Sequence, residues 1–405
     1  MDRYRPILDW IAGQQARMTD LLATWANVNS GSRNLVGLTR MLTMLRSAFA
    51  RLGEEMETVP LQPQVLLTPE GRYEEFPLGE ALVIRKRPDA KIRVFLGIHY
   101  DTVYPEDHPF QTATRVDSDR IQGPGVADAK GGAVVLLTAL EALERSPWAN
   151  ALGWEVLLNP DEEIGSPGSR FLFVDAARRN HLALLFEPSG VDGSLVSSRK
   201  GSAVYSALIV GRAAHAGRNP FEGCNAILAL ADFVKALDAI QTQRPGVLVN
   251  VAQVSGGGPA NVVPDLAFCR FNIRTDSRED QIQVERQLHD IVETFHQREG
   301  IRLEVHEDTK RPPKELDSRS LHFLDAIAQC AHDLGIELTW RASGGASDGN
   351  FLASEGIPTV DSLGVRGGGL HSREEYASLS SLTERAALTA LLLMKLASGE
   401  LLLPQ

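Results

Sequence analysis

The chain is organised around IHYD (residues 98–101), the start of a stretch that runs to Glu187. Polar motifs recur along this stretch, and each follows an apolar, strand-like run or a glycine turn. The further motifs are GPGVAD (123–128), NPDEE (159–163) and FEP (186–188). In open α/β sheets the ligand site lies outside the carboxyl ends of the strands. The stretch therefore predicts that distant polar residues meet at one edge of an α/β sheet.

Strand-like and helix-like runs alternate around these motifs, which is typical of a doubly wound α/β domain. One helix is expected from residue 6 to about residue 26, and a second follows a turn at 29–32 and ends near residue 52. A helix of about 15 residues opens at 128–132, and its apolar positions occupy nearly every face, so it should be covered on both sides. Strands are expected at 81–86, 93–98, 154–158 and 182–186.

The pattern changes near Ser198 and changes back after Arg311. Between these points the expected order is strand, helix, strand, strand, helix, strand, which is the ferredoxin-like split unit that closes its own sheet. We therefore predict an inserted α+β domain at 198–310, between two parts of an α/β catalytic domain at 1–197 and 311–405. The inserted elements are expected at 203–211, 224–240, 247–254, 266–274, 278–298 and 301–307, and the later ones from 318, at 337–341, at 358–363 and at 379–396.

Composition limits the class of protein. With 405 residues the chain is too long for one ordinary core, so about two domains are expected. A formal net charge of −11 argues against nucleic acid or an anionic membrane as partner, and no apolar run of about 18 residues could span a bilayer. Three scattered cysteines without a CxxC pair indicate reduced thiols. The amphipathic start is unlike a secretory signal, so we expect a cytoplasmic protein.

The polar motifs contain the residue types of a metal site that uses imidazole and carboxylate ligands. Two adjacent divalent ions, held roughly 3.5–4 Å apart, need a carboxylate that bridges both. Asp128 lies in a glycine-rich turn and is the expected bridge. His99 and Glu187 would complete the site of one ion, and Glu163 and His371 that of the other. This set suits two Zn²⁺ ions, and Mn²⁺ or Co²⁺ also fit.

Two further carboxylates have expected roles beside the ligands. Glu162 precedes Glu163, and because successive side chains diverge it cannot bind the same ion from the same side. It is placed to act as general base and to take a proton from the water that the metals acidify. Asp101 lies two residues beyond His99 on an extended segment, so it points the same way and can orient the imidazole. The alternative for the Glu162 and Glu163 pair is an ordinary solvated acidic doublet.

Together the motifs resemble those of the M20 family of dinuclear zinc peptidases, and within it the glutamate carboxypeptidase branch. The resemblance rests on HYDTV (99–103), GPGVADAKGG (123–132), DEEIGS (161–166), FEP (186–188) and HS (371–372), in this order over nearly the whole chain. It implies the same ligands, bridge and general base. It also implies a zinc-peptidase-like catalytic domain whose insertion is a lid and the usual dimerisation surface. One departure is Ala129, where many relatives have a polar or acidic residue, and the peptide bond before it is often cis in the family.

The resemblance adds four residues to the expected site. The segment around His215 is similar to one that carries a histidine into the partner subunit's active site, so His215 would stabilise the oxyanion there. Asn261 and Arg274 match positions that contact the substrate, the arginine through the terminal carboxylate. The alternatives are a loop histidine for His215 and a surface salt bridge for Arg274. Gly345 belongs to a glycine-rich loop that resembles the family's loop near the substrate.

These features predict a metal-dependent hydrolase that cleaves an amide bond and releases a C-terminal amino acid, glutamate or similar, from peptidyl or N-acyl substrates. One alternative is an N-acyl amino acid deacylase of the acetylornithine deacetylase or succinyl-diaminopimelate desuccinylase type, because those relatives share the metal centre. A second is a non-catalytic, amino-acid-binding member, although such a protein has no use for a general base at Glu162. The expected partners are a small-molecule substrate and a second copy of the chain, in a homodimer formed through the lid.

Overall fold

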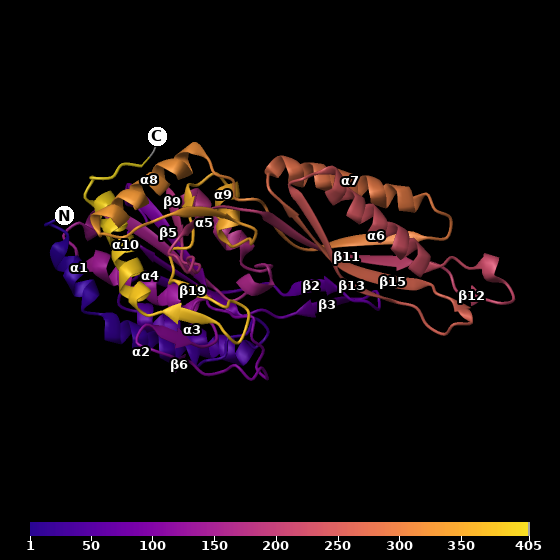
Figure 1. Cartoon of the computed structure of the whole chain (residues 1–405), viewed down its shortest axis with the longest axis horizontal. Helices are drawn as coiled ribbons and strands as arrows, with labels where there is room; N and C mark the ends of the chain where they lie inside the picture. Colours follow the sequence, from indigo (N-terminus) through magenta and orange to yellow (C-terminus); the bar gives the residue numbers. More distant parts are fainter. Residues whose placement is uncertain (404–405) are drawn as a thin grey trace.

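The computed structural model describes residues 1–403, which form two bodies joined side by side (Figure 1). The larger body is built from the two ends of the chain, and the smaller one contains α6, α7 and four long strands. The predicted class, an α/β catalytic domain with an α+β lid domain, is confirmed. Among the helices of residues 1–403, none combines the length and the apolar character needed to cross a membrane.

A six-stranded sheet forms the centre of the catalytic domain, in the order β1-β4-β8-β5-β9-β18. β8, β5, β9 and β18 run parallel to one another, whereas β4 pairs antiparallel with β8, and β1 pairs antiparallel with β4 at the edge. Because the parallel strands point the same way, their carboxyl ends share one edge of the sheet. The strands are β1 (Glu55–Pro60), β4 (Glu80–Lys86), β5 (Ile92–His99), β8 (Leu152–Asn159), β9 (Leu182–Leu185) and β18 (Thr359–Val360).

Helices cover both faces of this sheet, which explains why its strands are apolar on both sides. On one face, Val94 and Leu96 of β5 join a core that also contains residues of α4 and α10. On the other face, Phe95 packs edge to face on Phe173 of α5. As predicted, α4 is buried at most positions around its circumference. The helices are α1 (Arg5–Ala12), α2 (Gln15–Ala26), α3 (Leu35–Phe49), α4 (Lys130–Arg145), α5 (Arg170–Arg179), α8 (Ser318–Asp333), α9 (Gly349–Ser354) and α10 (Ser380–Ala397).

The lid domain is an antiparallel sheet in the order β13-β15-β11-β16, with α6 and α7 packed on one face. Its long elements follow the predicted order of strand, helix, strand, strand, helix and strand. A short pair, β12 (Ala214–His215) and β14 (Val262–Val263), forms a separate projection. The domain boundaries at 198 and 310 stay a prediction. The long elements are β11 (Gly201–Val210), α6 (Ala226–Gln243), β13 (Val247–Gly256), β15 (Leu266–Thr275), α7 (Arg278–His296) and β16 (Arg302–Arg311).

A hairpin that was not predicted connects the two domains. β2 (Gln64–Leu67) and β3 (Tyr73–Phe76) extend from the catalytic domain to the lid sheet (Figure 1). Leu67 packs in a small buried cluster with Leu208 of β11 and Phe268 of β15. These two side chains lie on the face of the lid sheet opposite α6 and α7. Each strand of the hairpin has only four residues, which is too short for a clear periodic signal.

Three predicted elements differ from the structure. The helix expected over 6–26 is two helices, because Gly13, a poor residue for a helix interior, follows the end of α1 at Ala12. The strand expected at 337–341 is β17 (Trp340–Ser343), whose bounds follow its pairing with β10 (Leu195–Arg199). The strand expected at 358–363 is shorter in the structure, where β18 has two residues. Ser362 has a positive φ of 69°, which is not an extended conformation.

Candidate metal centre

Three of the polar motifs meet at the carboxyl-terminal edge of the central sheet. His99 is the last residue of β5, and Glu187 follows β9 by two residues. Glu162 and Glu163 follow β8 and form a short 3-10 helix, η2 (Glu162–Ile164). Since β5, β8 and β9 are parallel neighbours, these side chains reach the same edge, as the sequence predicted.

Asp128 and His371 reach this edge from loops. Asp128 lies just before α4, and its peptide bond to Ala129 is cis. His371 lies between β19 (Gly367–Gly368) and β20 (Tyr376–Ser378), which form a small sheet with β7 (Arg120–Gln122) and β6 (Thr114–Arg115). The backbone of His371 has a positive φ of 60°. This conformation is uncommon outside glycine, and here the His371 imidazole lies beside Asp128 and Glu163.

The two carboxylate oxygens of Asp128 face different histidines. His99 Nε2 lies 3.1 Å from Asp128 Oδ1, and His371 Nε2 lies 3.4 Å from Asp128 Oδ2. Each histidine has a second carboxylate: Glu187 Oε2 is 3.8 Å from His99 Nε2, and Glu163 Oε2 is 3.2 Å from His371 Nε2. The structure therefore groups the five predicted ligands into two sets that share Asp128, in the same pairs as the sequence indicated.

The charges of this cluster fit a cation. Burial, together with the negative charge of Asp128, raises the pKa of Glu163 to about 7. Burial also raises the pKa of Glu187, although His99 opposes the shift. The buried Oε1 atom of Glu163 has no hydrogen-bond partner among residues 1–403. A divalent ion would supply both the missing partner and the missing positive charge, and carboxylate with imidazole is a donor set that suits Zn²⁺.

Asp101 organises the ligands from behind. Its Oδ1 lies 3.2 Å from His99 Nδ1, on the side of the imidazole away from Asp128. The backbone N–H groups of Glu162 and Glu163 donate to the two oxygens of Asp101, each over 3.2 Å. The Ser32 hydroxyl donates to Oδ2 over 2.6 Å. One buried carboxylate therefore orients His99, as the sequence suggested, and also holds the turn that carries both glutamates.

Glu162 is buried beside an arginine that was not identified from the sequence. Arg311 Nη2 lies 2.9 Å from Glu162 Oε1 and donates to the Glu162 carbonyl oxygen over 2.8 Å. The same nitrogen lies 3.1 Å from Asp348 Oδ1. Burial raises the pKa of Glu162 well above its ordinary value, while the Arg311 charge opposes that shift. The alternative of a solvated acidic doublet is wrong for Glu162, whose side chain is 10% exposed.

Arg274 and Gly345, two predicted substrate contacts, lie near each other where the lid meets the catalytic domain. Arg274 Nη1 donates to the carbonyl oxygen of Gly344 over 2.7 Å, and its Nε donates to Asn272 Oδ1 over 3.1 Å. The Gly345 carbonyl accepts from Arg199 Nη1 over 3.2 Å. The structure thus brings the lid arginine to the glycine-rich loop of the catalytic domain. No carboxylate within 4.0 Å pairs with Arg274 among residues 1–403, so the surface salt bridge is not present.

His215 and Asn261 lie together but far from these groups. The Asn261 carbonyl accepts from Ala216 N–H over 2.9 Å, beside the pairing of β12 with β14. β12, which contains His215, lies at the end of the lid farthest from the catalytic domain (Figure 1). The chain therefore does not bring His215 to its own metal ligands.

A pocket of about 400 Å³ lies beside the predicted metal ligands at the edge of the sheet. Glu163 lines it together with Ser32 and Thr102, and the Arg33 side chain adds a positive charge. Its volume is in the range of small-molecule sites. The parallel sheet edge, the paired ligand sets and the adjacent pocket define a metal-dependent hydrolase with a lid domain.

Comparison with known proteins names the group to which this hydrolase belongs. Residues 95–395 match the model of the peptidase family M20/M25/M40, and the chain belongs to this family. It is 30% identical to carboxypeptidase G2 of Pseudomonas sp. (strain RS-16), over 80% of this chain and 78% of that protein. It is 27% identical to a succinyl-diaminopimelate desuccinylase of Nitrosospira multiformis, over 74% of this chain and 82% of that protein.

A solved structure has the same fold. The M20 family metallo-carboxypeptidase Sso-CP2 of Sulfolobus solfataricus superimposes with a TM-score of 0.70 at 17% identity, over 93% of this chain and 98% of that one. The predicted family and the predicted enzyme class, a metallopeptidase of the carboxypeptidase kind, are confirmed.

Proposed function

We propose that the protein binds two divalent metal ions, with zinc as the preferred ion, and that it hydrolyses an amide bond to release a C-terminal amino acid. The observation that supports this most directly is that the two oxygens of Asp128 face two different histidines. Asp128 would bridge the ions, with His99 and Glu187 completing one site and Glu163 and His371 the other. When bound, such a pair of ions makes water more acidic and polarises the amide carbonyl.

Glu162 is the proposed general base. Burial raises the pKa of Glu162, which makes its carboxylate a stronger base, and the ion pair with Arg311 opposes that shift and orients the side chain. The proton that Glu162 takes from water would then pass to the leaving nitrogen of the amide. Asp101 supports this step, because it fixes the backbone N–H groups of Glu162 and Glu163.

The substrate's carboxylate would lie against Arg274. The guanidinium group can donate two parallel hydrogen bonds to a carboxylate, and its contact with the Gly344 carbonyl orients it toward the glycine-rich loop that contains Gly345. A glutamate-like C-terminal residue is proposed because the motifs resemble those of the glutamate carboxypeptidase branch. Asn261, which lies beside His215 at the lid tip, would add a polar contact to the substrate of the partner subunit.

The alternative function is an N-acyl amino acid deacylase. The similarity to succinyl-diaminopimelate desuccinylase favours this alternative. Deacylation and release of a C-terminal amino acid both hydrolyse an amide next to a carboxylate, so the same site could serve either reaction. A non-catalytic, amino-acid-binding role is less consistent with a complete set of five ligands and a buried Glu162. Proposed ions besides Zn²⁺ are Mn²⁺ and Co²⁺.

We further propose a homodimer formed through the lid, in which His215 reaches the partner's metal centre. The position of β12 at the far end of the lid supports this. From there His215 does not reach the metal ligands of its own chain, but it could reach those of a second copy. We propose a cytoplasmic location, which fits the absence of a disulfide among Cys224, Cys269 and Cys330.

The experiment that tests the function measures release of free amino acid from peptides and N-acyl amino acids, with added zinc and with a chelated control. Chelator-sensitive release of C-terminal glutamate or a similar residue supports the carboxypeptidase. Activity confined to N-acetyl or N-succinyl diamino acids supports the deacylase. If protein with two bound metals cleaves none of these substrates, the hydrolase proposal is wrong.

A further inference from the structure

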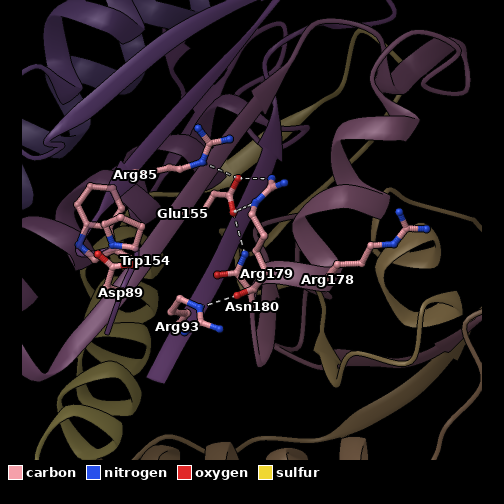
Figure 2. Close-up of a pocket in the computed structure, with 9 residues that line it drawn as sticks. Arg85, Asp89, Arg93, Trp154, Glu155, Arg178, Arg179 and Asn180 are labelled. Atoms are coloured by element: carbon pink, nitrogen blue, oxygen red, sulfur yellow. Dashed lines mark hydrogen bonds and ion pairs between the residues drawn. The ribbon is translucent and has the colours of Figure 1, made fainter. Parts of the chain in front are cut away.

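A pocket lies at the opposite end of the central sheet from the metal centre (Figure 2). Arg93 near the start of β5 and Trp154 near the start of β8 line it, whereas the metal ligands follow the other ends of these strands. Its volume is about 460 Å³, which is in the range of small-molecule sites. Neither the metal ligands nor the proposed substrate contacts belong to it.

The walls of this pocket carry a surplus of positive charge, although the whole chain has a formal net charge of −11. Arg85 and Arg179 share one carboxylate, Glu155: Arg85 Nε lies 3.2 Å and Arg179 Nη2 lies 2.7 Å from its Oε1 (Figure 2). The side chain of Glu155 is only 7% exposed, and its oxygens accept from both arginines and from Asn180 Nδ2. Glu57, 3.8 Å from Arg85 Nη1, is mostly exposed and screens little. Two guanidinium groups with one buried carboxylate leave about one positive charge.

Arg93 supplies a second positive charge. Its Nε donates to the Arg179 carbonyl oxygen over 2.6 Å, and its Nη1 donates to the Ala90 carbonyl oxygen over 2.8 Å. These carbonyls orient the guanidinium group without neutralising it, and no carboxylate lies within 4.0 Å of it in the described part of the chain. The effect of this charge extends to His181, which accepts the Arg93 backbone N–H at Nδ1. Burial lowers the pKa of His181, and Arg93 lowers it further.

The remaining walls differ in chemistry from the arginines. The indole of Trp154 and the ring of Pro88 provide apolar surface, whereas the Asn180 amide nitrogen already donates to Glu155 and to the Ala176 carbonyl. Asp89 is the other carboxylate that lines the pocket, and its negative charge reduces the surplus to about one positive charge. Arg178 points away from the group in Figure 2 and pairs with Asp175 and Glu355. The pocket therefore combines fixed cations with apolar surface, which suits a ligand that has both an anionic group and a carbon skeleton.

We propose that this pocket binds a small organic anion, with Arg93 as its principal cation and with Arg85 and Arg179, which share Glu155, on the adjoining wall. The anionic group is a phosphate or a carboxylate, since both accept paired hydrogen bonds from a guanidinium fork. The site is separate from the proposed hydrolase site and does not depend on that function.

The test is isothermal titration calorimetry of the zinc-loaded protein at constant ionic strength, with inorganic phosphate and with succinate as probes. Both anions can also bind at a metal centre, so variants must separate the sites. Arg93→Gln should weaken the binding of the preferred probe at least ~10-fold, because a charge-assisted hydrogen bond is lost. Arg178→Gln, a change at the pocket's outward-paired arginine, is the matched control and should bind as wild type does.

Binding of phosphate alone identifies phosphorylated ligands, binding of succinate alone identifies carboxylates, and either supports the site if Arg93→Gln weakens it. Unchanged binding by a folded Arg93→Gln protein, or no saturable binding of either probe by wild type, overturns the proposal. Circular dichroism checks folding. If Arg93→Gln does not fold, Arg93→Lys serves instead: it keeps the charge but loses the planar fork, and it should weaken binding at least ~3-fold. Unchanged binding by Arg93→Lys then overturns the proposal.

Discussion

The metal centre and the tip of the lid are both expected parts of one active site, but only the metal centre is assembled within a single chain. At the sheet edge one chain assembles the four other predicted ligands around Asp128. At the lid tip, His215 and Asn261 lie next to each other but away from that edge. The difference teaches that residues at neighbouring strand ends are brought together by the sheet itself. Residues on an inserted domain depend on how that domain, or a second copy of it, is placed.

The largest expected effect tests the metal edge. Glu162→Gln removes the proposed base but keeps the shape of the side chain, so kcat should fall about 10²–10⁴-fold with both metals retained. Steady-state kinetics and elemental analysis of the bound metal measure the two quantities. Asp107→Asn, at an exposed carboxylate, is the control and should keep the wild-type rate. A Glu162→Gln rate close to that of wild type would remove this residue from the mechanism.

The next effect tests the lid tip. His215→Ala should lower kcat about 10²–10³-fold without changing metal content, because an oxyanion contact is lost. His289→Ala, at an exposed histidine on α7 of the same domain, should have no effect. Unchanged turnover of His215→Ala would show that the lid tip takes no part in the reaction.

Mixing variants sharpens this test, because the two residues of one composite site would come from different subunits. Reassociated His215→Ala and Glu162→Gln subunits should regain about a quarter of the wild-type activity. Half of the dimers are then mixed, and each has one complete site. Activity that stays at the sum of the separate variants would place both residues in the same subunit's site, or exclude the dimer.

A smaller effect, on metal affinity, is expected at Asp101, which contacts the ligand His99. Asp101→Asn keeps one acceptor oxygen but loses the negative charge beside His99, so metal affinity should fall about 10–100-fold. Competition with a coloured chelator measures the affinity. Added zinc should restore much of the activity of this variant, in contrast to Glu162→Gln. An affinity equal to that of wild type would show that the contact does not tune the site.

The smallest effect on activity is expected at the hairpin between the two domains, where the change lowers stability instead. Leu67→Ala removes the side chain that packs on Leu208 and Phe268, at a cost of about 2–5 kcal/mol for a buried leucine. Amide hydrogen exchange in β2 and β3 should become faster, while metal content stays the same. Val65→Ala, at a more exposed position of the same strand, is the matched control. Exchange equal to that of wild type would mean that the hairpin is held by other contacts.

Much of the site could be predicted because its residues follow local rules. His99 ends an apolar run, Glu162 and Glu163 follow another, and Glu187 follows a third. In a parallel sheet these ends share one edge, so motif order was sufficient. Arg311 was missed because it lies 149 residues from Glu162 in the sequence and was seen only as the end of an inserted domain. Periodicity carries no signal for such a contact.

The sequence by itself determined the family and the order of the long elements in the lid. Its motifs also predicted which residues group around Asp128, and the roles of metal ligand and general base stay predictions. Only the tertiary structure decided that Arg311 pairs with Glu162, that Leu67 packs on the lid and that Arg93 lacks a carboxylate partner among the described residues. The physical reason is that backbone direction within a sheet follows from short runs of residues. Contacts between distant side chains depend on how whole elements pack, and no short run of residues specifies that.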